Sequence, residues 1–269
     1  MFLDWLRENR RRKILAATFP RTWRRIIDRN VAHCRWLNTQ EQQHLCDLVQ
    51  VFVAEKRWEG AGGQELSDEI RVTIAAQACL LILGLAHQLY RRVDSIVVYP
   101  STVVPRRHPP RMLSAGALIS EQPMPTLGQA FLRGPVILVW DAVKSGGRDP
   151  NDGKNVVYHE FAHKLDMLTG HADGVPPLAD RDTYNVWVEV LTAEYERLQR
   201  DAKRGKRTFL DTYALKSGAE FFAVATEHFF EQAPKMARDH PDMYRVLGDF
   251  YRQDPARRHA PGNHPATHR

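Results

Sequence analysis

The sequence predicts an α+β protein, because of its length, its composition and the order of its expected elements. Its 269 residues suffice for one sizeable domain, and 43% hydrophobic with 26% charged residues is typical of globular chains. Segments with helical periodicity occupy most of the chain, whereas β-branched runs are few and short. We therefore expect a helical N-terminal part, a small sheet and a helical C-terminal half, in a single domain at 31–253.

Apolar residues at helical spacing predict two helices in the N-terminal part. The first spans 39–53, where Thr39 followed by Gln42 forms a capping-box pattern. A glycine-rich break at 60–63 precedes the second helix, which begins after Ser67 and is apolar on nearly all sides. We expect this second helix to lie at the centre of the core.

Two β-branched runs predict the main strands. Residues 95–104 are expected to form a strand that bends or lies at a sheet edge, because Pro100 has no N–H to donate. A proline-rich turn at 105–110 leads to a further strand candidate at 113–120. The clearest strand is 135–140, which is either fully buried or an edge to which an extended substrate peptide adds.

Beyond this strand the sequence predicts a loop followed by helices. The loop begins at Asp141 and is rich in turn-forming residues. At the other end, residues 254–269 have no apolar face and are expected to form a disordered tail. Between them, the segments with helical periodicity are 152–168, 182–199, 217–231 and 241–251.

Positive charge is concentrated at the N-terminus. Residues 1–30 contain nine basic and three acidic side chains, a surplus equal to the net charge of +6 of the whole chain. Such a basic arm could contact nucleic acid, an anionic membrane surface or an acidic partner. We expect a solvated helix face and no direct nucleic-acid binding, because no nucleic-acid motif accompanies the charge.

No segment indicates a membrane protein or a secreted protein. The longest apolar run, 78–86, has about half the length that a bilayer crossing requires. No apolar signal stretch follows the first charged residues. The cysteines, Cys34, Cys46 and Cys79, lack disulfide or metal spacing, which suits a reducing compartment. We therefore expect a cytoplasmic protein.

An HExxH motif at 159–163 is the strongest chemical signal. Residues four apart lie one turn apart on a helix, so His159 and His163 can present ring nitrogens to one zinc ion. Glu160 is displaced from that face and is the expected general base. The alternative is a pair of buried histidines that hydrogen-bond to carboxylates.

Two histidines leave a catalytic zinc site one protein ligand short. Glu220 is either that ligand or, with Ser217, part of a capping box at a helix start, and the residue pattern leaves both interpretations open. Asp166 is better placed to accept a hydrogen bond from an imidazole than to bind the metal. The acidic residues considered for the third position are Asp166, Asp173, Asp211, Glu220, Glu227 and Glu231.

A family pattern is carried by the segments 60–83, 134–140, 153–168, 174–178 and 220–230. In these segments the chain resembles the Mlc titration factor A family, bacterial zinc metallopeptidases of the gluzincin type with a core similar to that of anthrax lethal factor. The resemblance extends over about residues 20 to 251. The departures are the proline- and arginine-rich stretch 104–111 and the histidine-rich tail, which concern loop shape and substrate access.

The resemblance implies a zincin-like core in which His159, His163 and Glu220 hold one zinc ion per chain. It also implies Glu160 as the base and Tyr213 as an active-site phenol, although Tyr213 could equally be a half-buried aromatic side chain that anchors the preceding link. The implied function is aminopeptidase-type hydrolysis of a peptide or protein substrate. The implied partner is the Mlc transcriptional repressor, which affects glucose-uptake genes. The alternative function is a non-catalytic regulatory protein that sequesters a repressor.

Overall fold

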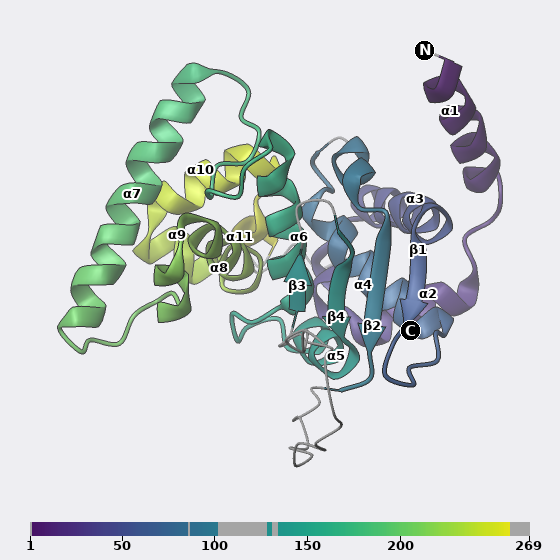
Figure 1. The fold of residues 1–269 in the computed structure, drawn as a ribbon, viewed down its shortest axis with the longest axis horizontal. Helices are drawn as coiled ribbons and strands as arrows, with labels where there is room; N and C mark the ends of the chain where they lie inside the picture. Colours follow the sequence, from purple (N-terminus) through teal and green to yellow (C-terminus); the bar gives the residue numbers. More distant parts are fainter. Residues whose placement is uncertain (1, 86, 102–127, 131–133, 259–269) are drawn as a thin grey trace, which may run out of the picture.

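The computed structural model describes residues 2–85, 87–101, 128–130 and 134–258, and it confirms the α+β class. Figure 1 shows its four-stranded sheet, in the order β1-β2-β4-β3. The first, second and fourth strands are parallel, and β3 runs antiparallel along the outer side of β4. The strands are β1 (Arg57–Gly60), β2 (Ser95–Tyr99), β3 (Gly128–Ala130) and β4 (Val136–Val139).

β2 is an interior strand, so the prediction of an edge strand is wrong, whereas the chain does bend at residues 100 and 101; residues 102–104 lie outside the described part of the chain. It pairs with β1 on one side and with β4 on the other, where Ile96 lies beside Val136. Pro100 follows the last strand residue and ends the strand, because it has no N–H to add to a ladder. β4 is also paired on both sides, so it is not the edge to which a peptide could add.

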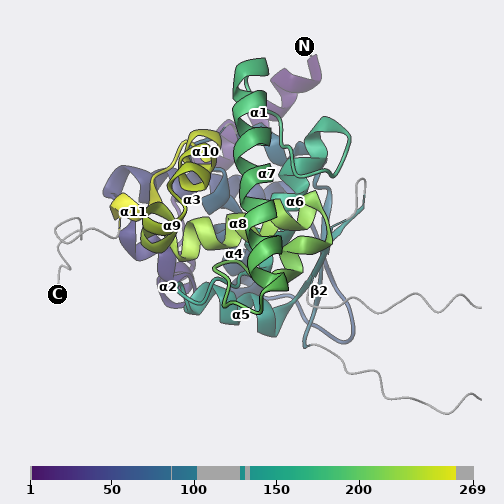
Figure 2. The same cartoon turned by 90° about the vertical axis from the view of Figure 1, so that its left-hand side faces the viewer.

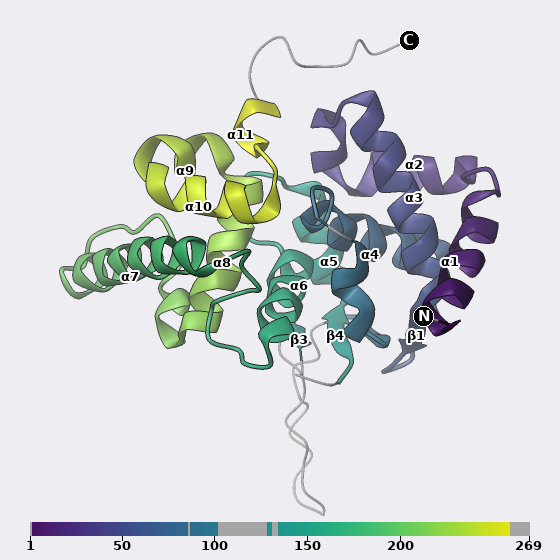
Figure 3. The same ribbon diagram turned by 90° about the horizontal axis from the view of Figure 1, so that it is seen from above.

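The N-terminal part of the chain is helical, as the sequence predicts. Figure 3 shows its helices beside the sheet, with the first helix on the outside of the molecule. Residues 1–30, the expected basic arm, contain two of these helices. The elements are α1 (Phe2–Leu15), α2 (Arg21–Asn30), the 3-10 helix η1 (Ala32–Trp36), α3 (Thr39–Glu55), α4 (Asp68–Leu81) and the 3-10 helix η2 (His87–Arg92).

Side-chain caps define where α3 and α4 begin. Ser67 caps α4, which is buried along nearly its whole length, as expected for a central helix. The cap of α3 lies one residue earlier than predicted: Asn38 and Glu41 form the reciprocal capping box, instead of Thr39 and Gln42. The reason is that asparagine caps at least as well as threonine and the Glu41 carboxylate reaches the N–H of Asn38.

Residues 140–148 form a helix, α5 (Trp140–Arg148), so the prediction of a loop from Asp141 is wrong. Gly146 and Gly147 favoured the loop, because glycine is a poor helix former. In the structure both are buried, and a Cβ atom on Gly147 would lie 2.4 Å from the carbonyl oxygen of Asn30. The glycine therefore permits a close contact between α5 and the end of α2.

The C-terminal half is helical, and all four predicted segments are present. A further helix at 233–239 was not predicted, and 255–258 form a short helix at the start of the expected tail. Residues 259–269, the expected turn at 105–110 and the strand candidate at 113–120 lie outside the described residues. The elements are α6 (Val156–Asp166), η3 (Met167–Thr169), α7 (Arg181–Lys203), η4 (Thr212–Lys216), α8 (Gly218–Glu231), α9 (Ala233–Asp239), α10 (Pro241–Tyr251) and α11 (Pro255–Arg258).

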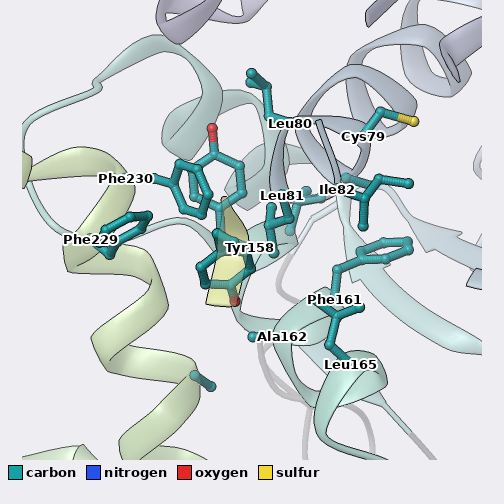
Figure 4. Close-up of a cluster of buried hydrophobic side chains, with 14 of the residues drawn as sticks. Cys79, Leu80, Leu81, Ile82, Tyr158, Phe161, Ala162, Leu165, Phe229 and Phe230 are labelled. Atoms are coloured by element: carbon teal, nitrogen blue, oxygen red, sulfur yellow. The ribbon is translucent and has the colours of Figure 1, made fainter. Parts of the chain in front are cut away.

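α6 lies at the centre of the molecule, between α8 on one side and α4 with the sheet on the other (Figure 3). Figure 2 shows the long helix α7 running across the outside of this layer. In the core, the rings of Tyr158 and Phe230 have centroids 5.3 Å apart, and Phe161 lies on the side of Ile82 (Figure 4). α6 is therefore held from two sides. None of the described helices is long and apolar enough to cross a bilayer.

Candidate metal centre

The HExxH motif lies on α6, in agreement with the predicted helix. The helix begins after Asn155, whose Oδ1 accepts hydrogen bonds from the N–H groups of Val157 and Tyr158. One turn apart on the helix, His159 and His163 have Nε2 atoms 3.2 Å from each other. Both imidazoles are therefore directed toward one position.

Glu220, in the first turn of α8, lies at the same position. Its Oε2 is 3.0 Å from Nε2 of His159 and 3.5 Å from Nε2 of His163. The helix start is formed independently, because the backbone N–H of Glu220 donates to Oγ of Ser217 at 3.2 Å. The Ser217 hydroxyl thus caps α8 by accepting the backbone N–H of Glu220. The Glu220 carboxylate is not needed for the cap and is directed toward the imidazoles.

The separations of these three atoms fit one zinc ion. Two tetrahedral ligand atoms at about 2.0–2.1 Å from zinc lie about 3.3 Å apart. The three distances in the structure are 3.2, 3.0 and 3.5 Å. Two imidazoles with a carboxylate are also a donor set found at catalytic zinc sites.

The Glu220 carboxyl group and the His159 imidazole favour each other's charged forms. Burial opposes ionisation of Glu220, but hydrogen bonds from His159 and His163 hold its pKa well below the usual range. Burial also opposes protonation of His159, but hydrogen bonds to Glu220 and Glu227 raise the pKa of that imidazole to about 10. A metal cation would therefore meet a carboxylate that is already ionised.

Glu160 lies beside this group. Its side chain is buried, with 3% of the residue exposed, and its Oε2 has no hydrogen-bond partner within the described part of the chain. Burial raises the pKa of Glu160 to about 7, despite the nearby imidazole of His159. A carboxyl group with a near-neutral pKa and an unused oxygen is suited to exchange a proton with water.

Tyr213 lies on η4, close to both groups. Its O–H is 3.4 Å from Oε1 of Glu220, and its ring centroid is 6.0 Å from that of His159. The ammonium group of Lys216 lies 3.8 Å from the centroid of the phenol ring. Tyr213 is 42% exposed, so this side chain lies at the surface beside the three ligand atoms.

Two of the acids considered as ligands have other partners near the motif. Glu227 lies behind His159, with Oε1 2.8 Å from Nδ1, and sequence reasoning did not find this role. Glu227 follows Glu220 by seven residues, which places both on one face of α8 but does not reveal the contact with His159. Asp166 accepts hydrogen bonds from the N–H of Gly174 at 2.9 and 3.1 Å instead of the predicted one from an imidazole, because the following loop folds over it.

The remaining acids bind backbone N–H groups. Glu231 accepts hydrogen bonds from Gly153 and Lys154, in the loop before α6. Asp173 and Asp211 each accept a hydrogen bond from the N–H two residues later. Of the acids considered, Glu220 is the one that the structure brings within reach of both histidines.

Comparisons with known proteins place this chain in a family context. A family model described as glucose-regulated metallo-peptidase M90 matches residues 5–252. The chain is 34% identical to the uncharacterized protein slr2042 of Synechocystis sp., over 94% of this chain and 90% of that protein. It is 33% identical to the Mlc titration factor A of Serratia proteamaculans, over 82% and 84% of the two chains. It is 32% identical to the Mlc titration factor A of Yersinia enterocolitica, over 88% of this chain and 86% of that protein. The resemblance expected from the sequence is confirmed.

Proposed function

The chain belongs to the glucose-regulated metallo-peptidase M90 family, and we propose that it is a zinc-dependent peptidase of the gluzincin type. The observation that supports zinc is the approach of His159, His163 and Glu220 at separations that suit one ion. One zinc ion per chain, a zincin-like core and aminopeptidase-type cleavage of peptides are part of this proposal.

His159, His163 and Glu220 would hold the ion. When bound, zinc would supply a water molecule of lowered pKa and polarisation of the peptide carbonyl. Glu160 would accept a proton from the attacking water and transfer it to the leaving amine. The buried position and unused Oε2 of Glu160 support this role, because no other described group competes for that oxygen.

Tyr213 would donate a hydrogen bond to the oxygen of the substrate carbonyl as negative charge develops on it. Its O–H now contacts Oε1 of Glu220 at 3.4 Å, which is long for an O–H···O hydrogen bond. The hydroxyl therefore gives up little when it turns toward a substrate oxygen.

Replacement of Glu160 by glutamine tests the proposal. Glu160→Gln keeps the shape of the side chain but removes the base, so kcat for peptide hydrolysis should fall by about 10²- to 10⁴-fold. Metal analysis should still find one zinc ion per chain. Glu196→Gln, on the exposed face of α7, is the matched control and should leave kcat unchanged. Undiminished hydrolysis by Glu160→Gln would contradict the proposed mechanism.

A second function is supported by the names of the relatives, Mlc titration factor A. We propose that this chain also binds a transcriptional repressor of the Mlc type. Binding would not require hydrolysis, so Glu160→Gln should bind such a repressor as tightly as the parent protein. Biolayer interferometry with immobilised repressor would measure both affinities. Absence of binding by the parent protein would exclude this second function.

A further inference from the structure

Glu227 is a buried carboxylate in contact with one of the two candidate metal-binding histidines. It lies on α8, two turns after Glu220, and 8% of the residue is exposed. Its Oε1 is 2.8 Å from Nδ1 of His159, on the side of the ring opposite to Nε2. Its Oε2 accepts a hydrogen bond from the backbone N–H of Asn155 at 2.6 Å. Both carboxylate oxygens therefore have N–H partners.

This arrangement determines which nitrogen of His159 is available to a metal. A carboxylate accepts hydrogen bonds, so the nitrogen that it contacts, Nδ1, must carry the proton. When a metal takes the place of the second proton, the lone pair that binds it is therefore that of the other nitrogen, Nε2. That atom is the one directed toward Glu220 and His163.

Asn155 connects the backbone and the ring of His159 through Glu227. The carbonyl oxygen of Asn155 accepts the backbone N–H of His159 at 2.9 Å, while its own N–H holds Glu227. The contacts form a closed circuit of three residues, in which the start of α6 fixes the imidazole. The side-chain NH₂ of Asn155 is itself held by Gln77, Gly146 and Glu231.

The second imidazole lacks a comparable support. Nε2 of His163 faces His159 and Glu220, but Nδ1 of His163 has no hydrogen-bond partner among the residues that the structure describes. The two histidines of the motif are therefore unequal: the ring of His159 is anchored from behind, and that of His163 is positioned by α6 and by the shared group alone.

We propose that Glu227 is a positioning residue that holds the His159 ring with Nε2 toward the metal position, and that Asn155 holds Glu227. The inference rests on the proposed function, because it concerns the same metal centre. A carboxylate is required at this place, since both partners are N–H donors. In Glu227→Gln one of the two donors would face the NH₂ of the amide.

Zinc affinity, measured by competition with a chelator, tests this role independently of catalysis. Glu227→Gln should weaken zinc binding about 10- to 100-fold, the usual effect of losing an outer partner of a metal-binding histidine. Glu194→Gln is the matched control, because it replaces a carboxylate that contacts Nδ1 of a different histidine, His240, at 2.7 Å. It should change the affinity less than about threefold. Equal affinities of parent and Glu227→Gln, or equal losses in both variants, would overturn the proposal.

A measurement on the unmodified protein covers the case in which Glu227→Gln does not fold. In long-range ¹H–¹⁵N spectra of the zinc-loaded protein, His159 should show a protonated Nδ1 whose hydrogen exchanges more slowly with solvent than that of His163. A metal-bound Nδ1 on His159, or equally fast exchange at both rings, would refute the positioning role. If the parent protein binds no zinc at all, the proposed function itself fails. If it binds zinc and Glu227→Gln binds it equally, only the present inference fails.

Discussion

The two ends of α8 carry the same type of side chain in opposite surroundings. At the first turn, the Glu220 side chain is 22% exposed and faces two imidazoles, which keep its pKa well below the usual range. At the last turn, Glu231 is 1% exposed and accepts hydrogen bonds from Asn155 and from the loop before α6. Burial, with the nearby Asp152, raises the pKa of Glu231 to about 10.

This difference shows that partners from outside α8 decide what each carboxyl group does. Glu220 meets cationic or metal-binding groups of α6, whereas Glu231 is buried beside uncharged N–H donors and Asp152. Glu227, between them, accepts one hydrogen bond from each kind of partner, His159 and the backbone of Asn155. The first end of α8 is therefore expected to control metal binding and chemistry, and the last end to control stability.

The largest expected effect is a loss of zinc affinity on replacement of Glu220, at the first turn of α8. Glu220→Ala removes one of three zinc ligands, so zinc affinity should fall by more than about 100-fold, the upper effect of an outer partner. Glu231→Gln should retain its zinc. Metal analysis after dialysis against a weak chelator measures both variants. Full retention of zinc by Glu220→Ala would assign the third ligand position to another group.

A smaller effect is expected from the phenol beside Glu220. Tyr213→Phe removes the O–H proposed to stabilise the oxyanion, so kcat should fall by about 10²- to 10³-fold. Zinc content and KM should change little, because the ring and the ligands remain. Steady-state kinetics with a peptide substrate separates kcat from KM. A change in KM alone would show that Tyr213 binds the substrate and does not act in the transition state.

The pH dependence of the free energy of unfolding tests the state of Glu231, at the last turn of α8. An unfolded glutamate loses its proton near pH 4.3, whereas Glu231 in the folded protein keeps it until about pH 10. The unfolded state therefore binds fewer protons between these values, and the free energy of unfolding falls as pH rises, by at most about 1.4 kcal/mol per pH unit.

Glu231→Gln is permanently uncharged and lacks this contribution. Relative to the parent protein, the variant should be more stable at pH 9 than at pH 5. Urea denaturation of both proteins at pH 5, 7 and 9 gives the difference in the free energy of unfolding. A difference that stays constant with pH would show that Glu231 is ionised in the folded protein.

The smallest expected effect concerns the cap of α8. Ser217→Ala removes the hydroxyl that accepts the N–H of Glu220, which should lower the free energy of unfolding by about 1 kcal/mol. Zinc affinity should remain within a few-fold, because the Glu220 side chain keeps its imidazole partners. Thermal unfolding and chelator competition measure the two quantities. A loss of zinc affinity as large as that of Glu220→Ala would show that cap and ligand are inseparable.

Local signals explain which elements the sequence could predict. α4 and α6 have apolar periodicity within their own segments, so both helices could be predicted; the start of α4 was given by Ser67, whereas α6 begins after Asn155 and not at the predicted residue 152. β1 and β3 have only four and three residues and depend on pairing with neighbouring strands. α5 was missed because Gly147 serves a contact with Asn30, more than a hundred residues earlier in the chain.

The candidate site shows the same limit. The spacing of His159 and His163 determines their common face, so the pair could be predicted from the sequence. The choice of Glu220 among six acids depends on how α8 packs against α6, which no local pattern contains. The contact of Glu227 with His159 depends on the same packing, as does the Asp166 hydrogen bond with Gly174.

The contact between Asn30 and Gly147 has a practical consequence for anyone who shortens the chain. Asn30 ends α2, and its amide also donates hydrogen bonds to Glu69 and Thr73, inside the protein. A chain that starts at residue 31 would lose the buried side chain of Asn30 from its interior along with the basic segment. Cutting near residue 18, between the first two helices, would remove four of the eight arginines of residues 1–30 and leave Asn30 in place.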